Sequence, residues 1–512
     1  MKVPLTTMDF IHRAEQVYGD RIGLVDEPGM PGGGLGELTW KQIAELGRAQ
    51  AAKLDELGIG FGDRVAMVSH NAGRLLTSFF GVTPYGRVFV PINFRLQRPE
   101  IEYIVEHCGA RMLLVDPELE EMCKDLDVEH FVVMGTDSDP QMYLHGVDPQ
   151  PWDNPDEDAT AVINYTSGTT ARPKGVQQTH RTEWLNATTF GWHTGVDDWD
   201  NYLHTLPLFH CNGWGMPFAL AGMGCKNVII REVRGAEILR RVQEHDVTLM
   251  CGAPAVVQAI LDAAADWDGP IPGAGRTRMV VAGAPPPSQT IQRLEDELGW
   301  EFIQIYGLTE TAPLITMNRN RREYEGLNPE EKAKALGRAG VPTVGIQVKI
   351  DGQGEILARG NHILEAYWEQ PEATAEAIVD GWFHTGDGGE MSDDAYVTIS
   401  DRKKDVIISG GENVSSIEVE DALFSHPEVA EVAVIGVPHE KWGETVKGLV
   451  VLTEGSTLTG AELIEYCRTR IAHYKCPTSI EMRDVLARTA TGKLQKFKLR
   501  APYWEDMERQ VN

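Results

Sequence analysis

The sequence is poor in cysteine and has no long apolar segment. Its seven cysteines are odd in number and include no Cys-x-x-Cys pair, which argues against a disulfide framework and against a zinc site. No apolar run reaches the roughly 18 residues of a membrane-spanning helix, and the N-terminal segment has no signal-peptide core. The final ERQVN is not a peroxisomal address. We therefore expect a cytoplasmic protein with no membrane span.

Basic residues are also scarce. The chain has 47 lysines and arginines against 76 aspartates and glutamates, a formal net charge of −29. This balance opposes binding to nucleic acid or to anionic lipid, because both need a surplus of cations. A polyanionic ligand would need positive groups concentrated at one place. Plain solubility explains the negative charge equally well.

Three common nucleotide or hydrolase motifs are missing. The sequence contains no GxxxxGK[ST], no GxGxxG and no GxSxG. Their absence argues against a Walker-type P-loop, a dinucleotide-binding oxidoreductase and an α/β-hydrolase.

The pattern of apolar runs predicts an α/β protein of at least two domains, because 512 residues exceed what one core organises. Short apolar runs alternate with amphipathic helical stretches such as 38–58 and 235–246, which predicts βαβ units and parallel sheets. Strands are expected at residues 63–70, 110–116, 130–135, 160–166, 226–232, 247–254 and 277–284. Antiparallel hairpins at 344–360 and 390–402 predict a β-barrel-like subdomain. We expect a large N-terminal domain, 1–401, and a small α+β C-terminal domain, 402–512, joined by a hinge near 401–404.

The stretch NYTSGTTARPKG, Asn164–Gly175, concentrates hydrogen-bonding groups in a loop that follows an expected strand. Gly168 and Gly175 would let the backbone approach a ligand closely. Lys174 adds a positive charge, and four hydroxyls come from Thr166, Ser167, Thr169 and Thr170. Together they predict a cradle for a polyphosphate. Taken alone, such a loop is more often a flexible surface turn.

Six further motifs accompany this loop. They are LPLFHCNGWG (206–215), AGAPPP (282–287), YGLTE (306–310), GWFHTGD (381–387), DRKKDVIISGGENVSSIEVE (401–420) and TATGKLQK (489–496). Taken in this order with YTSGTTARPKG (165–175), they are similar to the motifs of the adenylate-forming superfamily, which includes acyl-CoA synthetases, luciferases and peptide-synthetase adenylation domains. The resemblance covers essentially the whole chain. The sequence departs from the family at Ala171, where a glycine is usual.

The resemblance implies two half-reactions that use ATP, Mg²⁺ and coenzyme A. A carboxylate attacks the α-phosphate of ATP to give an acyl-adenylate and pyrophosphate, and a thiol then displaces AMP. The hydroxyls of 166–170 and Lys174 are expected to hold the β- and γ-phosphates, and Thr309 to bind a phosphate oxygen. Glu310 and Thr170 are expected as Mg²⁺ ligands. On its own, Glu310 would be read as a solvated carboxylate at a helix start.

By the same resemblance, the adenosine lies between Tyr306 and backbone groups of Gly283, Ala284, Pro285 and Gly307. Asp387 would accept both ribose hydroxyls, a role suited to an acceptor-only carboxylate. Arg402 would reach the ribose and phosphate. A core tyrosine and a turn-forming aspartate are the alternatives for Tyr306 and Asp387.

The C-terminal domain is expected to supply a mobile catalytic residue. The resemblance gives Lys493 the task of bridging the carboxylate and the α-phosphate, a role that suits a long side chain carrying a point charge. The domain would then rotate about Lys404 and bring Gly410 and Gly411 beside the pantetheine arm. An exposed lysine and a hairpin turn are the alternatives.

The resemblance also places the acid beside His210, in a wall formed by Trp214, Cys251, Gly283 and Ala312. A core histidine is the alternative for His210. These mostly slim residues predict a medium- to long-chain fatty acid or a related aliphatic acid. Cys211 is expected to be a buried thiol, because the chemistry needs no thiol nucleophile.

We thus expect an AMP-forming acyl-CoA synthetase, an acid–thiol ligase. The alternatives are a non-catalytic ATP-binding sensor and an acyl-AMP ligase that acts on a carrier protein. A homodimer is a further expectation.

Overall fold

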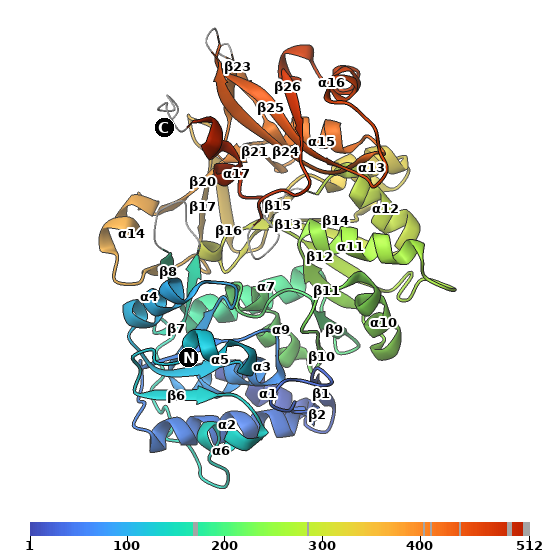
Figure 1. Ribbon diagram of the computed structural model, residues 1–512. Helices are drawn as coiled ribbons and strands as arrows, with labels where there is room; N and C mark the ends of the chain where they lie inside the picture. Colours follow the sequence, from blue (N-terminus) through green and yellow to red (C-terminus); the bar gives the residue numbers. More distant parts are fainter. Residues whose placement is uncertain are drawn as a thin grey trace.

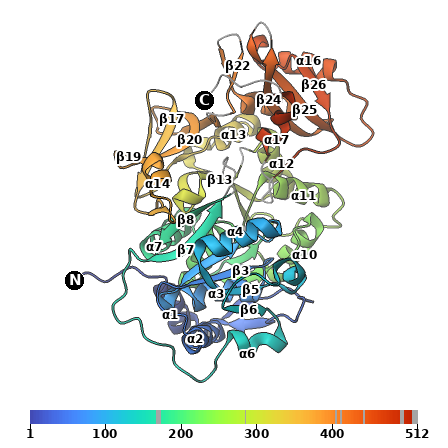
Figure 2. The same ribbon diagram turned by 60° about the vertical axis from the view of Figure 1, so that its left-hand side comes forward.

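The structure is a computed structural model that describes most of the chain (Figures 1 and 2). The described ranges are 1–166, 173–283, 286–402, 405–409, 412–439, 442–488 and 494–504, with the side chains of 401, 402, 412 and 413 left out. Both views show the C-terminal domain, in orange and red, above the sheets and helices of the large domain. The fold is therefore of the expected α/β class, with a large N-terminal and a smaller C-terminal domain.

The first large sheet has nine strands among the described residues. Its central strands, from β1 to β13 in space, are parallel, and β2, β14 and β15 add antiparallel edges. Parallel strands need crossover helices and are buried on both faces. The order is β15 (Val341–Pro342), β14 (Leu314–Arg319), β13 (Glu301–Gly307), β12 (Arg278–Val281), β11 (Leu249–Gly252), β9 (Asn201–His204), β10 (Lys226–Ile229), β1 (Ile22–Val25) and β2 (Glu37–Thr39).

The second large sheet has seven strands in the described part of the chain. Their order is β18 (Ala366–Tyr367), β8 (Lys174–Thr179), β7 (Thr160–Thr166), β4 (Val88–Ile92), β3 (Arg64–Val68), β5 (Ala110–Val115) and β6 (His130–Val133). The chain leaves β7 and returns antiparallel in β8, with Thr166 opposite Lys174. The expected phosphate loop thus joins the two strands of a hairpin.

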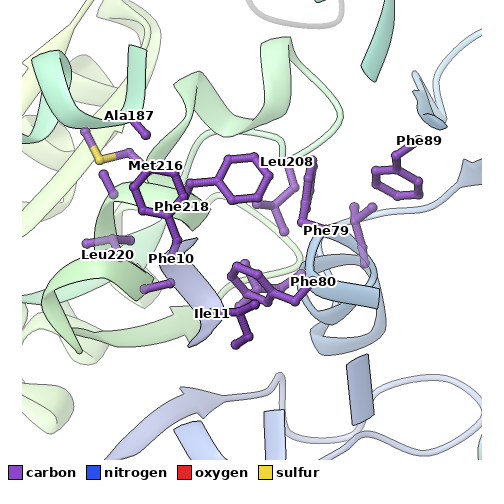
Figure 3. Close-up of a cluster of buried hydrophobic side chains, with 14 of the residues drawn as sticks. Phe10, Ile11, Phe79, Phe80, Phe89, Ala187, Leu208, Met216, Phe218 and Leu220 are labelled. Atoms are coloured by element: carbon purple, nitrogen blue, oxygen red, sulfur yellow. The ribbon is translucent and has the colours of Figure 1, made fainter. Parts of the chain in front are cut away.

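A hydrophobic core joins the two large sheets. Alternation along the strands explains this, since Val65 and Met67 of β3 face this core while Ala66 and Val68 face the opposite side of the sheet. Phe218 occupies the centre of the cluster in Figure 3. Its ring lies 5.8 Å from that of Phe10, 5.9 Å from Phe79 and 6.0 Å from Phe80, between centroids. These contacts link helices α1 (Met8–Tyr18), α3 (Gly73–Gly81) and α9 (Met216–Met223) within this core.

The helices cover both large sheets and the C-terminal sheet. They are α1 (Met8–Tyr18), α2 (Trp40–Glu56), α3 (Gly73–Gly81), α4 (Arg98–Cys108), α5 (Glu120–Cys123), α6 (Asp139–Met142), α7 (His180–Thr194), α8 (Cys211–Trp214), α9 (Met216–Met223), α10 (Gly235–His245), α11 (Pro254–Ala265), α12 (Ser288–Leu298), α13 (Pro329–Leu336), α14 (Pro371–Ala377), α15 (Ser416–Phe424), α16 (Gly460–Arg468) and α17 (Lys496–Arg500). Within the described ranges, none combines the length and the apolar character that a bilayer-spanning helix needs.

Local sequence signals explain where the helices begin and end. In α2, the hydroxyl of Thr39 accepts from the Gln42 N–H while the Gln42 side chain accepts from the Thr39 N–H, which forms a capping box. Helix α7 begins after Thr179, which accepts from the Thr182 N–H, and ends at Gly195 with φ 70°.

Two smaller sheets follow. The antiparallel sheet of β16 (Ile346–Ile350), β17 (Glu355–Gly360), β19 (Ile378–Val379), β20 (Trp382–Met391) and β21 (Val397–Arg402) confirms both expected hairpins. The C-terminal sheet consists of β22 (Ile407–Ser409), β23 (Glu412–Val414), β24 (Val429–His439), β25 (Gly443–Leu452) and β26 (Ser479–Met482). Strands β21 and β22 belong to different sheets, and the domain boundary near 401–404 stays a prediction.

Candidate active site

The site begins with a pair of buried polar side chains that come from two different sheets. The hydroxyl of Tyr306, near the end of β13, donates a hydrogen bond of 2.9 Å to Oδ2 of Asp387 in β20. Each residue is only 7% exposed. A buried carboxylate needs hydrogen-bond donors, so the tyrosine hydroxyl stabilises Asp387. The residue expected beside the adenine and the residue expected at the ribose hydroxyls are therefore in direct contact.

Arg402 lies beside this pair along the backbone. Strands β20 and β21 are antiparallel, and Asp387 stands opposite Arg402 in their ladder. Opposite residues of a ladder have Cβ atoms roughly 5 Å apart. The structure thus brings Asp387 and the backbone of Arg402 together, while the role of Arg402 stays a prediction.

A second group of side chains connects the phosphate hairpin to the expected Mg²⁺ ligand. Lys174 at the start of β8 places its Nζ 4.7 Å from the ring centroid of Tyr367, a cation–π distance. The hydroxyl of Tyr367 donates a hydrogen bond of 2.8 Å to Oε1 of Glu310. Burial, followed by the charge of Glu310, raises the pKa of Tyr367, so this hydroxyl remains a donor. One tyrosine therefore orients both a cation and a carboxylate.

Backbone bonds hold Tyr367 in this place. Strand β18 pairs with β8, with Tyr367 opposite Val176. The Trp368 N–H donates to the Gly175 carbonyl at 2.7 Å, and the Leu364 N–H donates to the Glu310 carbonyl at 2.7 Å. Gly175 also has a packing role, because a Cβ there would lie 3.0 Å from Cγ2 of Ile163.

The residues between Tyr306 and Glu310 form a tight turn. Gly307 is required there, because a Cβ would lie 1.5 Å from the Pro313 carbonyl oxygen. Residues Thr309–Thr311 make a short 3-10 turn, which ends at Ala312 with φ 65°. The turn keeps Glu310 close to the Tyr306–Asp387 pair, four residues along the chain from the tyrosine.

Ala312, which ends this turn, is one of the expected acid-binding residues. His210 directly precedes an unusual segment, residues 211–215, which we call the acid-side turn; it contains the short element α8, whose backbone is not that of a regular α-helix. All five of its residues have left-handed backbone conformations, with φ 45° at Cys211, 53° at Asn212, 57° at Gly213, 63° at Trp214 and 78° at Gly215. Left-handed conformation costs about 1–2 kcal/mol for each residue other than glycine. The segment is therefore strained and needs support from its surroundings.

The structure buries most of the expected acid-side residues. Trp214 is 4% exposed, and its ring lies 6.4 Å from that of Phe190. Cys251 is fully buried, and Cys211 is the buried thiol that we expected. Gly283 has φ 97°, which favours glycine. A role for these residues in binding the acid stays a prediction.

Several expected site residues lie outside the described part of the chain. They are Ser167, Gly168, Thr169, Thr170, Ala284, Pro285, Lys404, Gly410, Gly411 and Lys493. Thr166, the last described residue before the phosphate loop, ends β7 opposite Lys174.

Sequence reasoning missed Tyr367, Gln178, Asn212 and Glu183. The Gln178 side chain donates a hydrogen bond of 2.8 Å to the Thr309 carbonyl. Asn212 lies within a quoted motif, but nothing marked its side chain as important. Tyr367 resembles any core tyrosine in its local sequence, so only its three-dimensional neighbours reveal it.

Comparisons with known proteins agree with this arrangement. A family profile described as "AMP-binding enzyme" matches residues 11–368, and one described as "AMP-binding enzyme C-terminal domain" matches residues 418–493. The 2-methylpropanoate–CoA ligase of Humulus lupulus is 35% identical to the chain, over 97% of the chain and 95% of that protein. The 4-hydroxybutyrate–CoA ligase 2 of Metallosphaera sedula is 36% identical, over 97% of the chain and 94% of that protein.

Solved structures are similar over nearly the whole chain. An anthranilate CoA ligase in complex with anthranoyl-AMP has a TM-score of 0.85 and 27% identity, covering 98% of this chain and 99% of that one. The o-succinylbenzoate coenzyme A synthetase of Bacillus subtilis, in complex with ATP and a magnesium ion, has a TM-score of 0.81 and 27% identity, covering 96% of this chain and 99% of that one.

Proposed function

We propose residue roles and a substrate class for this chain, which belongs to the AMP-binding enzyme family and is an ATP-dependent acid–CoA ligase. Its cofactors and co-substrates are ATP, Mg²⁺ and coenzyme A. The observation that carries the residue roles is the Tyr306–Asp387 hydrogen bond. Glu310, whose carboxylate accepts a hydrogen bond from Tyr367, lies only four residues after Tyr306 in the chain.

The nucleoside binds, in this proposal, against Tyr306 and Asp387. The carboxylate of Asp387 accepts the ribose hydroxyls, and the hydrogen bond from Tyr306 fixes its direction. Arg402, its ladder neighbour, reaches the ribose and the α-phosphate. Gly283, Ala284 and Pro285 supply backbone groups to the adenine, and Gly307 allows the chain to turn closely behind it.

Glu310 fits the requirements of a magnesium ligand. Mg²⁺ takes oxygen ligands and commonly uses one or two carboxylates together with substrate phosphates. The bond from Tyr367 holds Glu310 as an acceptor-only carboxylate and fixes its orientation, as outer-shell partners do for metal ligands. Thr170 is the second proposed ligand. When bound, the ion neutralises charge on the phosphates.

The phosphate groups bind to the loop between β7 and β8. Lys174 and the hydroxyls of residues 166–170 hold the β- and γ-phosphates, and Thr309 binds a phosphate oxygen. Support comes from the hairpin register, which sets Thr166 and Lys174 opposite each other at the mouth of this loop. An acidic chain thus concentrates its positive groups where two anions, carboxylate and triphosphate, must meet.

The C-terminal domain supplies the mobile part of the mechanism. Lys493 bridges the attacking carboxylate and the α-phosphate in the first half-reaction. The domain then turns about Lys404, and Gly410 and Gly411 line the path of the coenzyme A thiol. Support for a hinge comes from the change of sheet between Arg402, where β21 ends, and Ile407, where β22 begins. We place the domains at 1–401 and 402–512.

The acid is aliphatic in this proposal, and it binds beside His210 against Trp214, Cys251, Gly283 and Ala312. The slim side chains of this wall favour a medium- to long-chain acid. The two relatives named above are ligases of short acids, 2-methylpropanoate and 4-hydroxybutyrate. The range to be tested therefore extends from acetate upward.

The proposal also covers the cellular compartment, the oligomeric state and the acceptor of the acyl group. All seven cysteines are buried and none forms a disulfide in the described part of the chain, which fits a reducing compartment such as the cytoplasm. We also propose a homodimer, which light scattering can test. A carrier protein as the acceptor is the alternative to free coenzyme A.

The test is acid-dependent AMP release with coenzyme A, measured across acids from acetate to palmitate with aryl acids included. We expect release to need the acid, ATP and coenzyme A together, with an aliphatic acid as the best substrate. Best activity with an aryl acid would contradict the substrate class, and release only with an acyl carrier protein would favour the alternative acceptor.

A further inference from the structure

A buried polar network joins the acid-side turn to the turn that carries Glu310. Its centre is Asn212, whose Nδ2 donates to Oε1 of Gln178 at 3.0 Å and to Oε1 of Glu183 at 2.8 Å. The Oδ1 of Asn212 accepts from Nδ2 of Asn164 at 3.1 Å. The same Gln178 side chain donates to the Thr309 carbonyl. Asn212 therefore links the two halves of the proposed site, beside a longer contact of 3.9 Å from Cys211 Sγ to the Thr309 carbonyl.

The network also supports the strained backbone of residues 211–215. Asn212 sits within the left-handed segment, where asparagine is tolerated better than most residues. A second amide, Asn186 on α7, donates to the Trp214 carbonyl at 3.2 Å. A Cβ at Gly215 would lie 2.4 Å from Nδ2 of Asn186, so the turn and α7 fit closely. Strained backbone that the surroundings hold in place is often functional.

In this network, one carboxylate oxygen of Glu183, Oε1, accepts a hydrogen bond from Asn212. The residue is 1% exposed, and among the described residues its Oε2 has no hydrogen-bond partner. Asn186, one turn further along α7 on the same face, also has an Oδ1 without a partner in the described part of the chain. A neutral carboxylic acid, which carries a donor proton, suits this environment better than a carboxylate.

The pKa of Glu183 agrees with a neutral side chain. Burial raises it to about 8, and the hydrogen bond from Asn212 opposes that shift. The strands packed against α7 carry Tyr165, Lys174 and Arg319, and the segment bonded to Glu183 through Asn212 carries Cys211. The other titratable groups on α7 itself are His180, Arg181 and His193. None of these groups acts on the pKa of Glu183.

We propose that Asn212, Gln178 and Glu183 are positioning residues that hold the acid-side turn in register with the turn Thr309–Thr311. The inference rests on the proposed function, which places the acid at the acid-side turn and the phosphates with Mg²⁺ at the turn Thr309–Thr311. A shift of about 1 Å between reacting groups can cost a factor of about 100 in rate. The network therefore affects how well the bound acid meets the nucleotide, and affects nucleotide binding itself much less.

The test uses acid-dependent ATP–pyrophosphate exchange, which reports the first half-reaction alone. The variant Asn212→Gly keeps a residue suited to φ 53° but removes the side-chain bonds. We expect its kcat/KM for the acid to fall about 100-fold, while its KM for ATP changes little. The control is Asn227→Gly, a buried amide of β10 that donates to the Gly23 carbonyl far from the turn. It should lower the melting temperature without changing the KM for the acid.

The pH profile provides the second readout. In the wild type, kcat/KM for the acid should fall above about pH 8 as Glu183 ionises. Glu183→Gln mimics the neutral side chain, so this alkaline decrease should disappear while most of the activity at pH 7 remains. Should Asn212→Gly fail to fold, the Glu183→Gln profile decides the question.

The outcomes distinguish a failure of the proposed function from a failure of the positioning role. If the wild type shows no exchange with any acid, the proposed function fails and the inference fails with it. If the wild type is active but Glu183→Gln keeps the alkaline decrease, or folded Asn212→Gly keeps the kcat/KM of the wild type, the positioning role alone is wrong.

Discussion

The Tyr306 hydroxyl donates a 2.9 Å hydrogen bond to the Asp387 carboxylate, and this bond joins the end of a strand in the nine-stranded sheet to a strand of the smaller antiparallel sheet. It sets the direction of a buried carboxylate before any ligand arrives. Preorganised polar groups of this kind reduce the cost of binding.

The Tyr306→Phe variant tests this bond. It keeps the aromatic ring but removes the donor, and a hydrogen bond to a charged group is worth about 1.5–3 kcal/mol. We expect the KM for ATP to rise by roughly 10- to 100-fold. The control Tyr466→Phe removes a hydroxyl that donates to the Ser425 carbonyl in the C-terminal domain. Equal KM values for ATP in wild type and Tyr306→Phe would contradict the role of Asp387 at the ribose.

The Tyr367→Phe variant tests the orientation of Glu310. The ring that faces Lys174 remains, so the change removes only the donor to the carboxylate. Loss of an outer-shell partner typically weakens metal binding about 10- to 100-fold. We expect the Mg²⁺ concentration at half-maximal rate to rise within that range, as measured by titration at fixed ATP. An unchanged Mg²⁺ dependence would remove Glu310 from the proposed metal site.

The sequence predicted most of the fold and the family, and the family prediction is confirmed by the profile matches. Strand periodicity located β3, β5 and β12, because strands with buried residues carry an apolar pattern that needs no tertiary information. It did not show that β8 returns antiparallel beside β7 or that β18, far along the chain, pairs with β8.

The site was only partly predictable, for the same reason. Tyr306 and Asp387 stand in recognisable motifs, so their proximity was expected. Tyr367 and Glu183 act through neighbours that are distant in sequence, and their own surroundings resemble ordinary core positions. The chain length of the acid stays a prediction, because the space around Trp214 and Cys251 depends on packing that the sequence does not display.

A hydrogen bond between Ser288 and Asp421 joins the two domains, and we expect it to help hold their relative orientation. Helix α12 begins after Pro287, which provides no side-chain cap, and Asp421 of α15 accepts from the Ser288 N–H at 3.0 Å instead. Loss of a helix cap costs about 0.5–2 kcal/mol. Because this cap exists only in the present orientation, Asp421→Ala should change the ratio of the two half-reaction rates by about 2- to 30-fold.

Rapid-quench measurement of adenylate formation, and of thioester formation from pre-made acyl-adenylate, checks this expectation. The control Ser288→Ala keeps the backbone bond and loses only the weaker 3.3 Å hydroxyl contact with Asp421, so its effect should be smaller. A ratio that does not change in Asp421→Ala would mean that the contact does not hold the domains.

The buried Glu183 also predicts how stability depends on pH. Its pKa rises from 4.5 to about 8 on folding, so the folded protein binds a proton that the unfolded chain has lost. The resulting stability is fully present below about pH 4.5, falls as the pH rises toward 8 and levels off above it. Glu183→Gln has no such proton. Its melting temperature minus that of the wild type should therefore increase between pH 5 and 8, and parallel curves would contradict a neutral Glu183.

The most direct test of the whole account separates the two half-reactions in the Lys493→Ala variant. Lys493 lies outside the described residues, and we assign it the bridge between carboxylate and α-phosphate. Adenylate formation should nearly disappear, by a factor of about 100 or more, because that step depends on charge neutralisation. Thioester formation from pre-made acyl-adenylate should continue at close to the wild-type rate. Equal loss of both steps, or full adenylate formation without Lys493, would contradict a mechanism in which this lysine serves only the first half-reaction.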